Sequence, residues 1–150
     1  MSDMATITWI GGTSNSANTA SNWQGGVKPA AGDVALFDNN AVANCVWDIP
    51  LPSTALSVDE IIVEDTYKDT TIPRTITLNA EVRIKGLFLN GTIVAGTQNV
   101  IHFESGFGSY ETYNNRYFLN GTDSVSTGLQ YRMTGTGVKF DDGNYPTVIL

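Results

Sequence analysis

Apolar residues along this chain recur at every second position or in short runs, and clusters of Gly, Asn, Asp and Pro separate them. A period of two is the spacing of a strand with one buried face, and the separating residues are typical of turns. The pattern predicts strands over residues 6–10, 34–37, 45–49, 60–64, 75–78, 81–85, 87–89, 93–94, 100–103, 117–119, 129–133, 138–140 and 147–150. Helical periodicity is almost absent, since even the best candidate, residues 55–64, lacks a clean apolar stripe. The sequence therefore predicts an all-β fold.

A five-residue motif, Phe-Leu-Asn-Gly-Thr, occurs at residues 88–92 and again at 118–122. Asn-Gly between apolar residues is a strong signal for a two-residue hairpin turn, which would pair 88–89 antiparallel with 92–93. The second arm soon reaches Ala95-Gly96, and a pair of that length is marginal unless a larger sheet includes it. The alternative is a corner of a β-solenoid, in which each coil buries the apolar face of its neighbour.

Residues 57–106 favour the solenoid for the middle of the chain, because three strand-rich stretches follow one another there with Gly or Asn at the turns. The predicted fold is a short β-solenoid-like or β-sandwich domain, with an antiparallel jelly-roll-like sandwich as the alternative. We expect a single domain over residues 1–150, with a cap-like segment at 1–52, a strand-rich core at 53–106 and C-terminal strands at 107–150. A chain of this length buries about 68–70% of its unfolded surface, which is enough for a core.

Composition and charge narrow the possible partners. Charged residues make up 15% of the chain, below the ~25% of typical domains, and the Gly, Thr, Asn and Ser in their place suit strands and turns. The formal net charge is −7 with eight Lys and Arg in total, so the chain is poorly equipped to neutralise phosphates. No apolar run approaches the ~20 residues of a membrane span, and residues 1–4 do not resemble a secretion signal. We expect no nucleic-acid partner, no membrane and no Sec export.

The ionisable residues give no catalytic pattern. The carboxylate pairs are sequence neighbours, namely Asp59-Glu60, Glu64-Asp65 and Asp141-Asp142. Glycosidases need two carboxylates that face each other across the substrate, whereas adjacent residues of a strand point to opposite faces. The Asp141-Asp142 turn also lacks the spacing of a calcium loop. These pairs therefore predict neither a glycosidase nor a calcium site.

His102 is the only histidine and Cys45 the only cysteine. A zinc site on these two would need two further ligands that nothing in the sequence marks. Neither a Gly-x-Ser-x-Gly motif nor a phosphate-binding loop occurs. Cys45 lies in an apolar strand pattern, where cysteine is typically a small buried residue. The sequence predicts no enzyme, no cofactor and no metal.

The aromatic residues of the first fifty positions predict a compact cap. The chain's three indoles all lie there with a phenyl ring, and each buried aromatic removes roughly 150–250 Å² from water. A proline can fix the connecting loop, and an aspartate can accept backbone hydrogen bonds at the turn. The residues expected to build this cap are Trp9, Trp23, Pro29, Asp33, Phe37 and Trp47. Exposed indoles that bind sugars are the alternative.

The same residues carry a resemblance to a known module. Their order runs roughly Trp-x-Gly, Ala-x-Asn-Trp, Gly-x-x-Pro and then Gly-Asp followed by Val and Phe. It resembles a cap-like module at the start of β-solenoid regions in bacterial surface proteins and in structural proteins of tailed bacteriophages. The stretches VDEIIVEDTY, VRIKGLFLNGTI and VKFDDGNYP are similar to segments of those phage proteins that form a strand and a corner. The resemblance covers about two thirds of the chain, and its motifs are structural.

The resemblance implies a non-enzymatic virion protein of the capsid decoration or cement type on the outer capsid surface. Its partners would be copies of itself, as a homo-oligomer such as a trimer, and the major capsid protein. A glycan-binding adhesin or a receptor-binding module of a tail fibre is the alternative. That alternative rests on the tyrosine-rich stretch at 108–118, whose candidate ligand-binding residues are Tyr110, Tyr113 and Tyr117.

Overall fold

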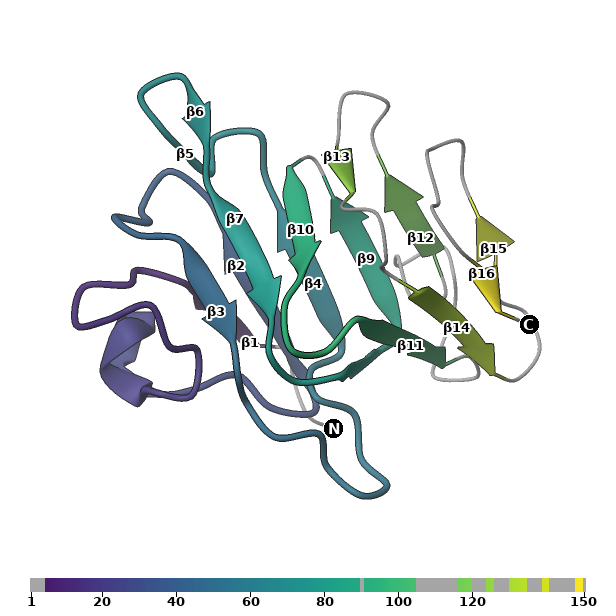
Figure 1. The fold of residues 1–150 in the computed structure, drawn as a ribbon. Coiled ribbons are helices and arrows are strands. Elements are labelled where there is room, and N and C mark those ends of the chain that lie inside the picture. Colours follow the sequence, from purple (N-terminus) through teal and green to yellow (C-terminus); the bar gives the residue numbers. More distant parts are fainter. Residues whose placement is uncertain are drawn as a thin grey trace.

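The fold is known from a computed structural model of the chain, which describes residues 5–89 and 91–104 and the strands at 116–119, 124–125, 130–134, 139–140 and 148–149. The only helical elements among these residues are two 3-10 turns, η1 (Ala20–Asn22) and η2 (Gln24–Gly26). All other regular elements are strands, which confirms the predicted all-β class (Figure 1). No helix in the described part is long and apolar enough to cross a bilayer.

Most strands belong to three parallel sheets. The long sheet has the order β1 (Ala5–Thr8), β2 (Asp33–Phe37), β4 (Glu60–Val63), β9 (Gly86–Leu89), β12 (Arg116–Leu119) and β15 (Lys139–Phe140). The β7 sheet consists of β3 (Cys45–Trp47), β7 (Thr75–Leu78), β10 (Thr92–Ala95) and β13 (Ser124–Val125). The β11 sheet consists of β8 (Val82–Ile84), β11 (Val100–Glu104), β14 (Gln130–Thr134) and β16 (Val148–Ile149). The two-stranded sheet of β5 (Lys68–Asp69) and β6 (Ile72–Pro73) is antiparallel.

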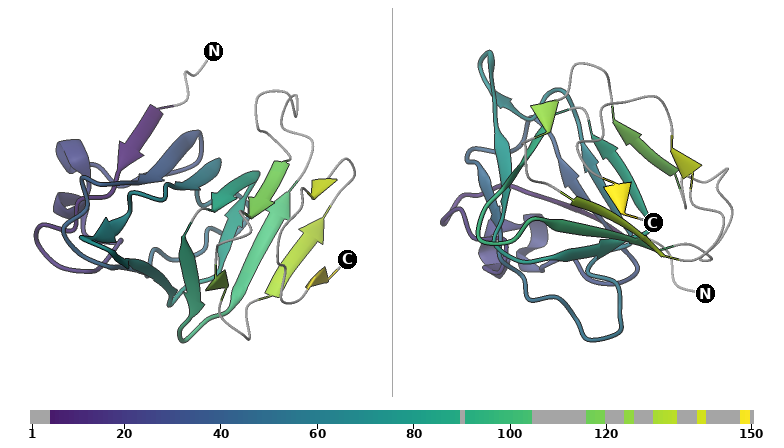
Figure 2. Two further views of the ribbon diagram at one scale, coloured as in Figure 1. Left: turned by 90° about the horizontal axis from the view of Figure 1, so that it is seen from above. Right: turned by 45° about the vertical axis from the view of Figure 1, so that its right-hand side comes forward.

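From β4 to β15, the chain passes through these sheets in a fixed order, and we call each such circuit a passage. It leaves the long sheet for the β7 sheet, continues to the β11 sheet and returns to the long sheet beside its previous strand. Parallel neighbours cannot be joined by a tight turn, and here the strands of the other two sheets form the connection that a helix usually supplies. Successive passages lie side by side, so that in Figure 2 (left) the purple and yellow strands mark opposite ends of the molecule.

The repeated Phe-Leu-Asn-Gly-Thr motif lies on neighbouring passages. Phe118 pairs with Phe88 and Leu119 with Leu89, so the first two residues of the copies pair in register, whereas Thr92 pairs with Ser124. The antiparallel pairing expected of a hairpin does not form, because β9 and β10 belong to different sheets and each pairs in parallel with strands of other passages. The chain therefore changes sheets between β9 and β10. Gly91 suits this position, since a Cβ atom there would lie 2.8 Å from Cγ1 of Val63 on the preceding passage.

The core fills the space that the three sheets enclose. Inward positions of the long sheet form rows across its strands, with Ala35 beside Ile61 beside Leu87 and Phe37 beside Val63 beside Leu89. The other two sheets contribute buried side chains such as Ile76, Leu78, Val82, Ile84 and Ile93. Each passage therefore covers the apolar edge of the one before it, which accounts for the short apolar runs in the sequence.

Candidate functional site

An aromatic cluster surrounds β2 and β3, which form the first passage, and its members are Trp9, Trp23, Phe37, Trp47 and Tyr67. The ring centroids of Trp9 and Trp23 are 5.2 Å apart, and those of Phe37 and Tyr67 are 5.3 Å apart, both with edge-to-face geometry. Trp23 also contacts Phe37 and Trp47 edge to face, at 5.8 Å and 6.2 Å. All five side chains are at most 2% exposed. Buried indoles are unavailable as a sugar-binding platform, and their packing suits a structural role.

Tyr67 is the member of this cluster that sequence reasoning missed. Its hydroxyl donates a hydrogen bond of 2.8 Å to the carbonyl oxygen of Thr75, and burial raises its pKa well above the usual range. Tyr67 follows β4 and precedes the β5–β6 hairpin, so it ties the second passage to the ring cluster of the first. No period-two pattern could have marked it, since β4 ends at Val63 and the exposed Asp65 stands in a turn between the two residues.

Asn22 holds the glycine-rich loop against the cluster. Its side-chain oxygen accepts hydrogen bonds from the backbone N–H groups of Thr13 and Ser14, both at 2.8 Å. Its amide nitrogen donates to the Ser14 hydroxyl and to the Ser16 carbonyl, also at 2.8 Å each. The residue is fully buried. In the Asn-Trp pair, the amide of Asn22 therefore holds the loop, and the indole of Trp23 packs in the core.

We expect Asn22→Ala to lower the free energy of unfolding by about 2–3 kcal/mol, because the loop at Thr13 and Ser14 would lose the hydrogen bonds of a fully buried amide. Urea unfolding curves would measure the loss. Ser21→Ala is the matched control, since Ser21 precedes it and makes only an exposed bond to the Thr13 hydroxyl. Equal losses for the two variants would contradict the assigned role.

The two remaining residues of the predicted cap lie at the start of β2 and in the loop before it. Pro29 is buried there, and Asp33 begins β2. The Asp33 carboxylate accepts a hydrogen bond of 3.0 Å from the N–H of Ala30, which closes the turn. Gly32 within this turn has a φ of +94°, a conformation that favours glycine.

A pair of buried carboxyls lies where the chain enters β4. Asp59 forms an ion pair of 3.1 Å with Lys85 of the next passage and accepts a 2.7 Å bond from the N–H of Gly32 on the preceding one. Glu60 is 5% exposed, and its Oε1 has no hydrogen-bond partner among the described residues. Burial, and then the charge of Asp59, raise the pKa of Glu60 to about 7, while Lys85 opposes this shift. Glu60 can therefore hold a proton near neutral pH, but it does not reach solvent.

Sequence reasoning did not identify Glu60 as special. It treated Asp59-Glu60 as neighbours on opposite faces, which argued against paired catalysis. In the structure, Glu60 pairs in register with Val34 of β2 and Gly86 of β9. Its surroundings thus come from strands that lie far from it in the sequence, and no local signal could have revealed the burial.

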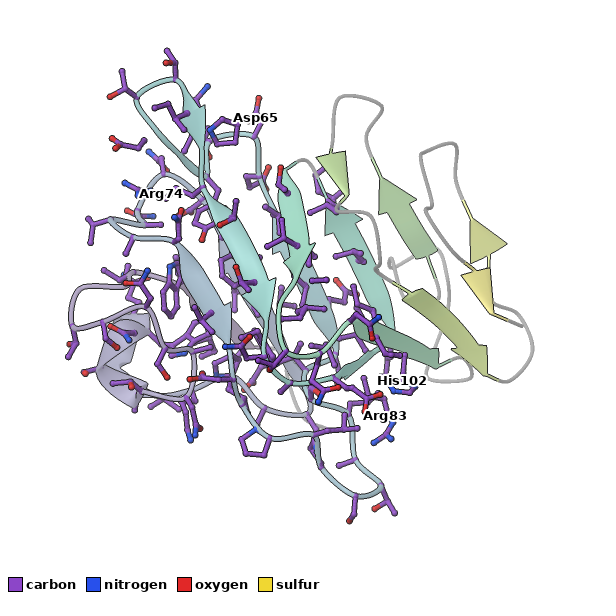
Figure 3. All side chains as sticks on the ribbon, in the orientation of Figure 1. Asp65, Arg74, Arg83 and His102 are labelled. Atoms are coloured by element: carbon purple, nitrogen blue, oxygen red, sulfur yellow. The ribbon has the colours of Figure 1, made fainter. Side chains whose placement is uncertain are left out.

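The single histidine and the single cysteine make structural contacts. Nε2 of His102 (labelled in Figure 3) lies 2.8 Å from Oε1 of Glu81, which forms an ion pair when the imidazole is protonated. Cys45 is fully buried, and burial raises the pKa of its thiol well above the usual range, which disfavours the reactive thiolate. Within the described ranges, no three His, Cys, Asp or Glu side chains are close enough to hold a metal ion.

The candidates for glycan binding and the last carboxylate pair cannot be placed. Tyr110, Tyr113, Asp141 and Asp142 lie outside the described residues, and for Tyr117 only the backbone of β12, opposite Leu87, is described. Glycan binding by the three tyrosines stays a prediction.

A shallow, open groove lies between the loop at 28–31 and the loop at 49–57, and we call it the loop groove. Its volume is about 360 Å³. It is lined by Lys28, Pro29, Ala30, Ala31, Ile49, Pro52, Ala55, Leu56 and Ser57. The lining is mostly apolar, with Lys28 and Ser57 as its polar side chains, and lacks the convergent polar groups that orient small-molecule ligands. The groove thus suits an apolar protein side chain better than a sugar.

Comparisons with protein-family models, curated proteins and solved structures find no significant match to this chain. The resemblance to phage and bacterial surface modules therefore rests on sequence motifs alone. The described residues form stacked parallel strands, an aromatic cluster around the first passage, two buried carboxyls and a mostly apolar groove.

Proposed function

We propose that this chain is a β-solenoid that acts as a non-enzymatic structural subunit of a virion, of the capsid decoration or cement type. The observation that carries the proposal is the repeated passage through the same three sheets in parallel register. Stacked passages of this kind support one another through nearest-neighbour contacts and present regular outer faces. An antiparallel jelly-roll-like sandwich would require a different pairing of the strands.

The use of the ionisable side chains supports a role without catalysis. Asp59 pairs with Lys85 across passages, and His102 pairs with Glu81. Glu60 and Cys45 are buried. Catalysis needs such groups at an open, concave site where a substrate can reach them. In the described part of this chain, these side chains instead form ion pairs or are buried among the strands.

In this role the protein would associate with copies of itself, for example as a trimer, and with the major capsid protein. Each contact can be weak, because many copies on one lattice act together through avidity. The net charge of −7 suits the outer surface of a capsid, away from the packaged nucleic acid. The motif resemblance and the acidic charge are the two sequence features that support this location.

We expect the purified protein to rebind capsids stripped of it and to saturate at a fixed number of copies per capsid, because lattice sites repeat with the capsid symmetry. Co-sedimentation followed by cryo-electron microscopy of the particles would measure both occupancy and position. An unrelated acidic protein of similar size is the control. Absence of binding at high protein concentration, or turnover of a substrate by the monomer, would contradict the proposal.

A further inference from the structure

The β5–β6 hairpin is an insertion that the parallel stack does not need. It lies between β4 and β7, where the chain uses eleven residues to move from the long sheet to the β7 sheet. The equivalent step from β9 to β10 uses only residues 90 and 91. All six residues of the hairpin, 68–73, are exposed, and in Figure 1 it projects beyond the upper edge of the sheets. The insertion therefore adds surface and no core.

The tip of this hairpin combines an exposed apolar side chain with a strained backbone. Ile72 is 69% exposed, which is the largest value among the exposed large hydrophobic residues of the described part. Thr70 has a φ of +54°, a left-handed conformation that β-branched residues rarely adopt. A positive φ is the geometry that a two-residue hairpin turn favours, so the turn sets the position of Ile72 at the tip.

The loop groove lies at the opposite edge of the molecule. In Figure 1, and in the right-hand view of Figure 2, the loop that joins β3 to β4 extends below the sheets while the hairpin extends above them. The groove contains Ala55 from this loop and Pro29 from the loop before β2. The hydroxyl of Ser57 already accepts a bond from the N–H of Arg83, so the groove offers mainly apolar contacts. Its volume, about 360 Å³, is at the small end of the range for binding pockets, roughly 300–1,000 Å³.

The charges of the two surfaces are complementary. Lys28 is the only ionisable residue that lines the groove, and it is exposed at the rim beside Asn18. Residues 64–69, which lead into the hairpin tip, contain Glu64, Asp65 and Asp69 against the single cation Lys68. Figure 3 shows Asp65 and the half-buried Arg74 at the base of the hairpin. For a chain with a net charge of −7, a local cation opposite local carboxylates favours one orientation between copies.

We propose that Ile72 and Pro73 of one copy dock in the loop groove of a second copy of this chain, with Asp69 paired to Lys28 of that second copy. The proposal rests on the self-association in the proposed function and names its interface. The two surfaces are different patches at opposite edges, so the contact is heterologous and each copy both gives a hairpin and receives one. Heterologous contacts close into a ring when the rotation between copies permits it, and otherwise they build an open filament.

Two single variants and one control test this interface. Ile72→Asp places a charge at the hairpin tip, and Ala55→Glu places one in the groove at an exposed position. Each should weaken self-association about tenfold or more, because the apolar contact would have to desolvate a charge. Val42→Asp is the matched control, since Val42 is 62% exposed and belongs to neither surface. Analytical ultracentrifugation over a concentration series would measure association, with thermal unfolding to verify the fold.

Mixing the two variants provides the decisive measurement. The Ile72→Asp protein keeps an intact groove, and the Ala55→Glu protein keeps an intact hairpin. An equimolar mixture should therefore form a one-to-one dimer that grows no further. Lys28→Glu should weaken association several-fold, and combining it with Asp69→Lys should restore it.

The outcomes separate this inference from the proposed function. Wild-type assembly that Ile72→Asp leaves unchanged would overturn the docking, although capsid rebinding could still hold through another face. Loss of assembly in Ala55→Glu but not in Ile72→Asp would mean that the groove receives another occupant, which also overturns the docking. A mixture that remains monomeric would overturn the heterologous contact.

Discussion

Replacing Glu60 with glutamine should stabilise the protein by about 3 kcal/mol at pH 8 and leave its stability near pH 4.5 almost unchanged. The pKa of Glu60 is raised from 4.5 to about 7 in the folded protein, mainly by burial and then by the charge of Asp59. Ionisation of this buried carboxyl therefore opposes folding. Glutamine has a similar shape and no charge at any pH, so it removes that cost.

The direction of the pH dependence follows from the raised pKa. Below pH 4.5 the carboxyl is protonated in both the folded and the unfolded chain, and Glu60 costs nothing. As the pH rises toward 7, the unfolded chain releases the proton while the folded chain still holds it, so the free energy of unfolding falls. Above the folded pKa the loss is complete. The wild-type protein should thus lose stability across this window relative to Glu60→Gln.

Urea unfolding of both proteins at a series of pH values from 4.5 to 8.5 would measure this difference. The difference between the two curves isolates Glu60 from the other titrating groups, including Asp59 and Lys85, which flank it. Glu64→Gln is the matched control, because it removes the same charge from a carboxyl on the same segment that is less buried. Parallel curves for wild type and Glu60→Gln would show that Glu60 titrates normally and would refute the prediction.

The strands could be predicted because their signals are local. The segment from Val34 to Phe37 follows Gly32-Asp33 and ends at Asp38, and β2 occupies the same positions. The same holds for β7, where Thr75 to Leu78 alternates in burial as a period of two requires. The β5–β6 hairpin was not predicted, since Lys68–Asp69 and Ile72–Pro73 lack that alternation and proline in a run argues against a strand.

How the strands pair could not be predicted, because the pairing is decided by distant residues. Asn-Gly at 90 and 91 is equally consistent with a hairpin turn and with a corner. The hairpin does not form, because Leu87 and Leu89 bury their side chains beside Ile61 and Val63, which belong to the preceding passage. A local motif cannot report that contact. The same limit applies to the candidate site, where the indoles could be recognised by type but the hydrogen bonds of Asn22 could not.

Truncating Phe37 should produce the largest loss of stability at the aromatic cluster. Its ring contacts those of Trp9, Trp23 and Tyr67, with centroids 6.2 Å, 5.8 Å and 5.3 Å away, and it is fully buried. Phe→Ala in a core costs about 3–5 kcal/mol, a large share of the roughly 5–15 kcal/mol that stabilises a typical domain. Phe37→Leu retains most of the volume and should cost much less.

Phe37→Ala should also loosen the first passage more than the later ones, because in a stack each passage is stabilised mainly by its nearest neighbours. Hydrogen exchange should therefore quicken in β2 and β3 before it quickens in β9 and β11, and the emission of the three tryptophans should shift to the red. Leu36→Ala is the matched control, since Leu36 is the preceding residue and is only half-buried. If both truncations cost the same, or if exchange quickens uniformly, the cluster does not act as the local anchor of the first passage.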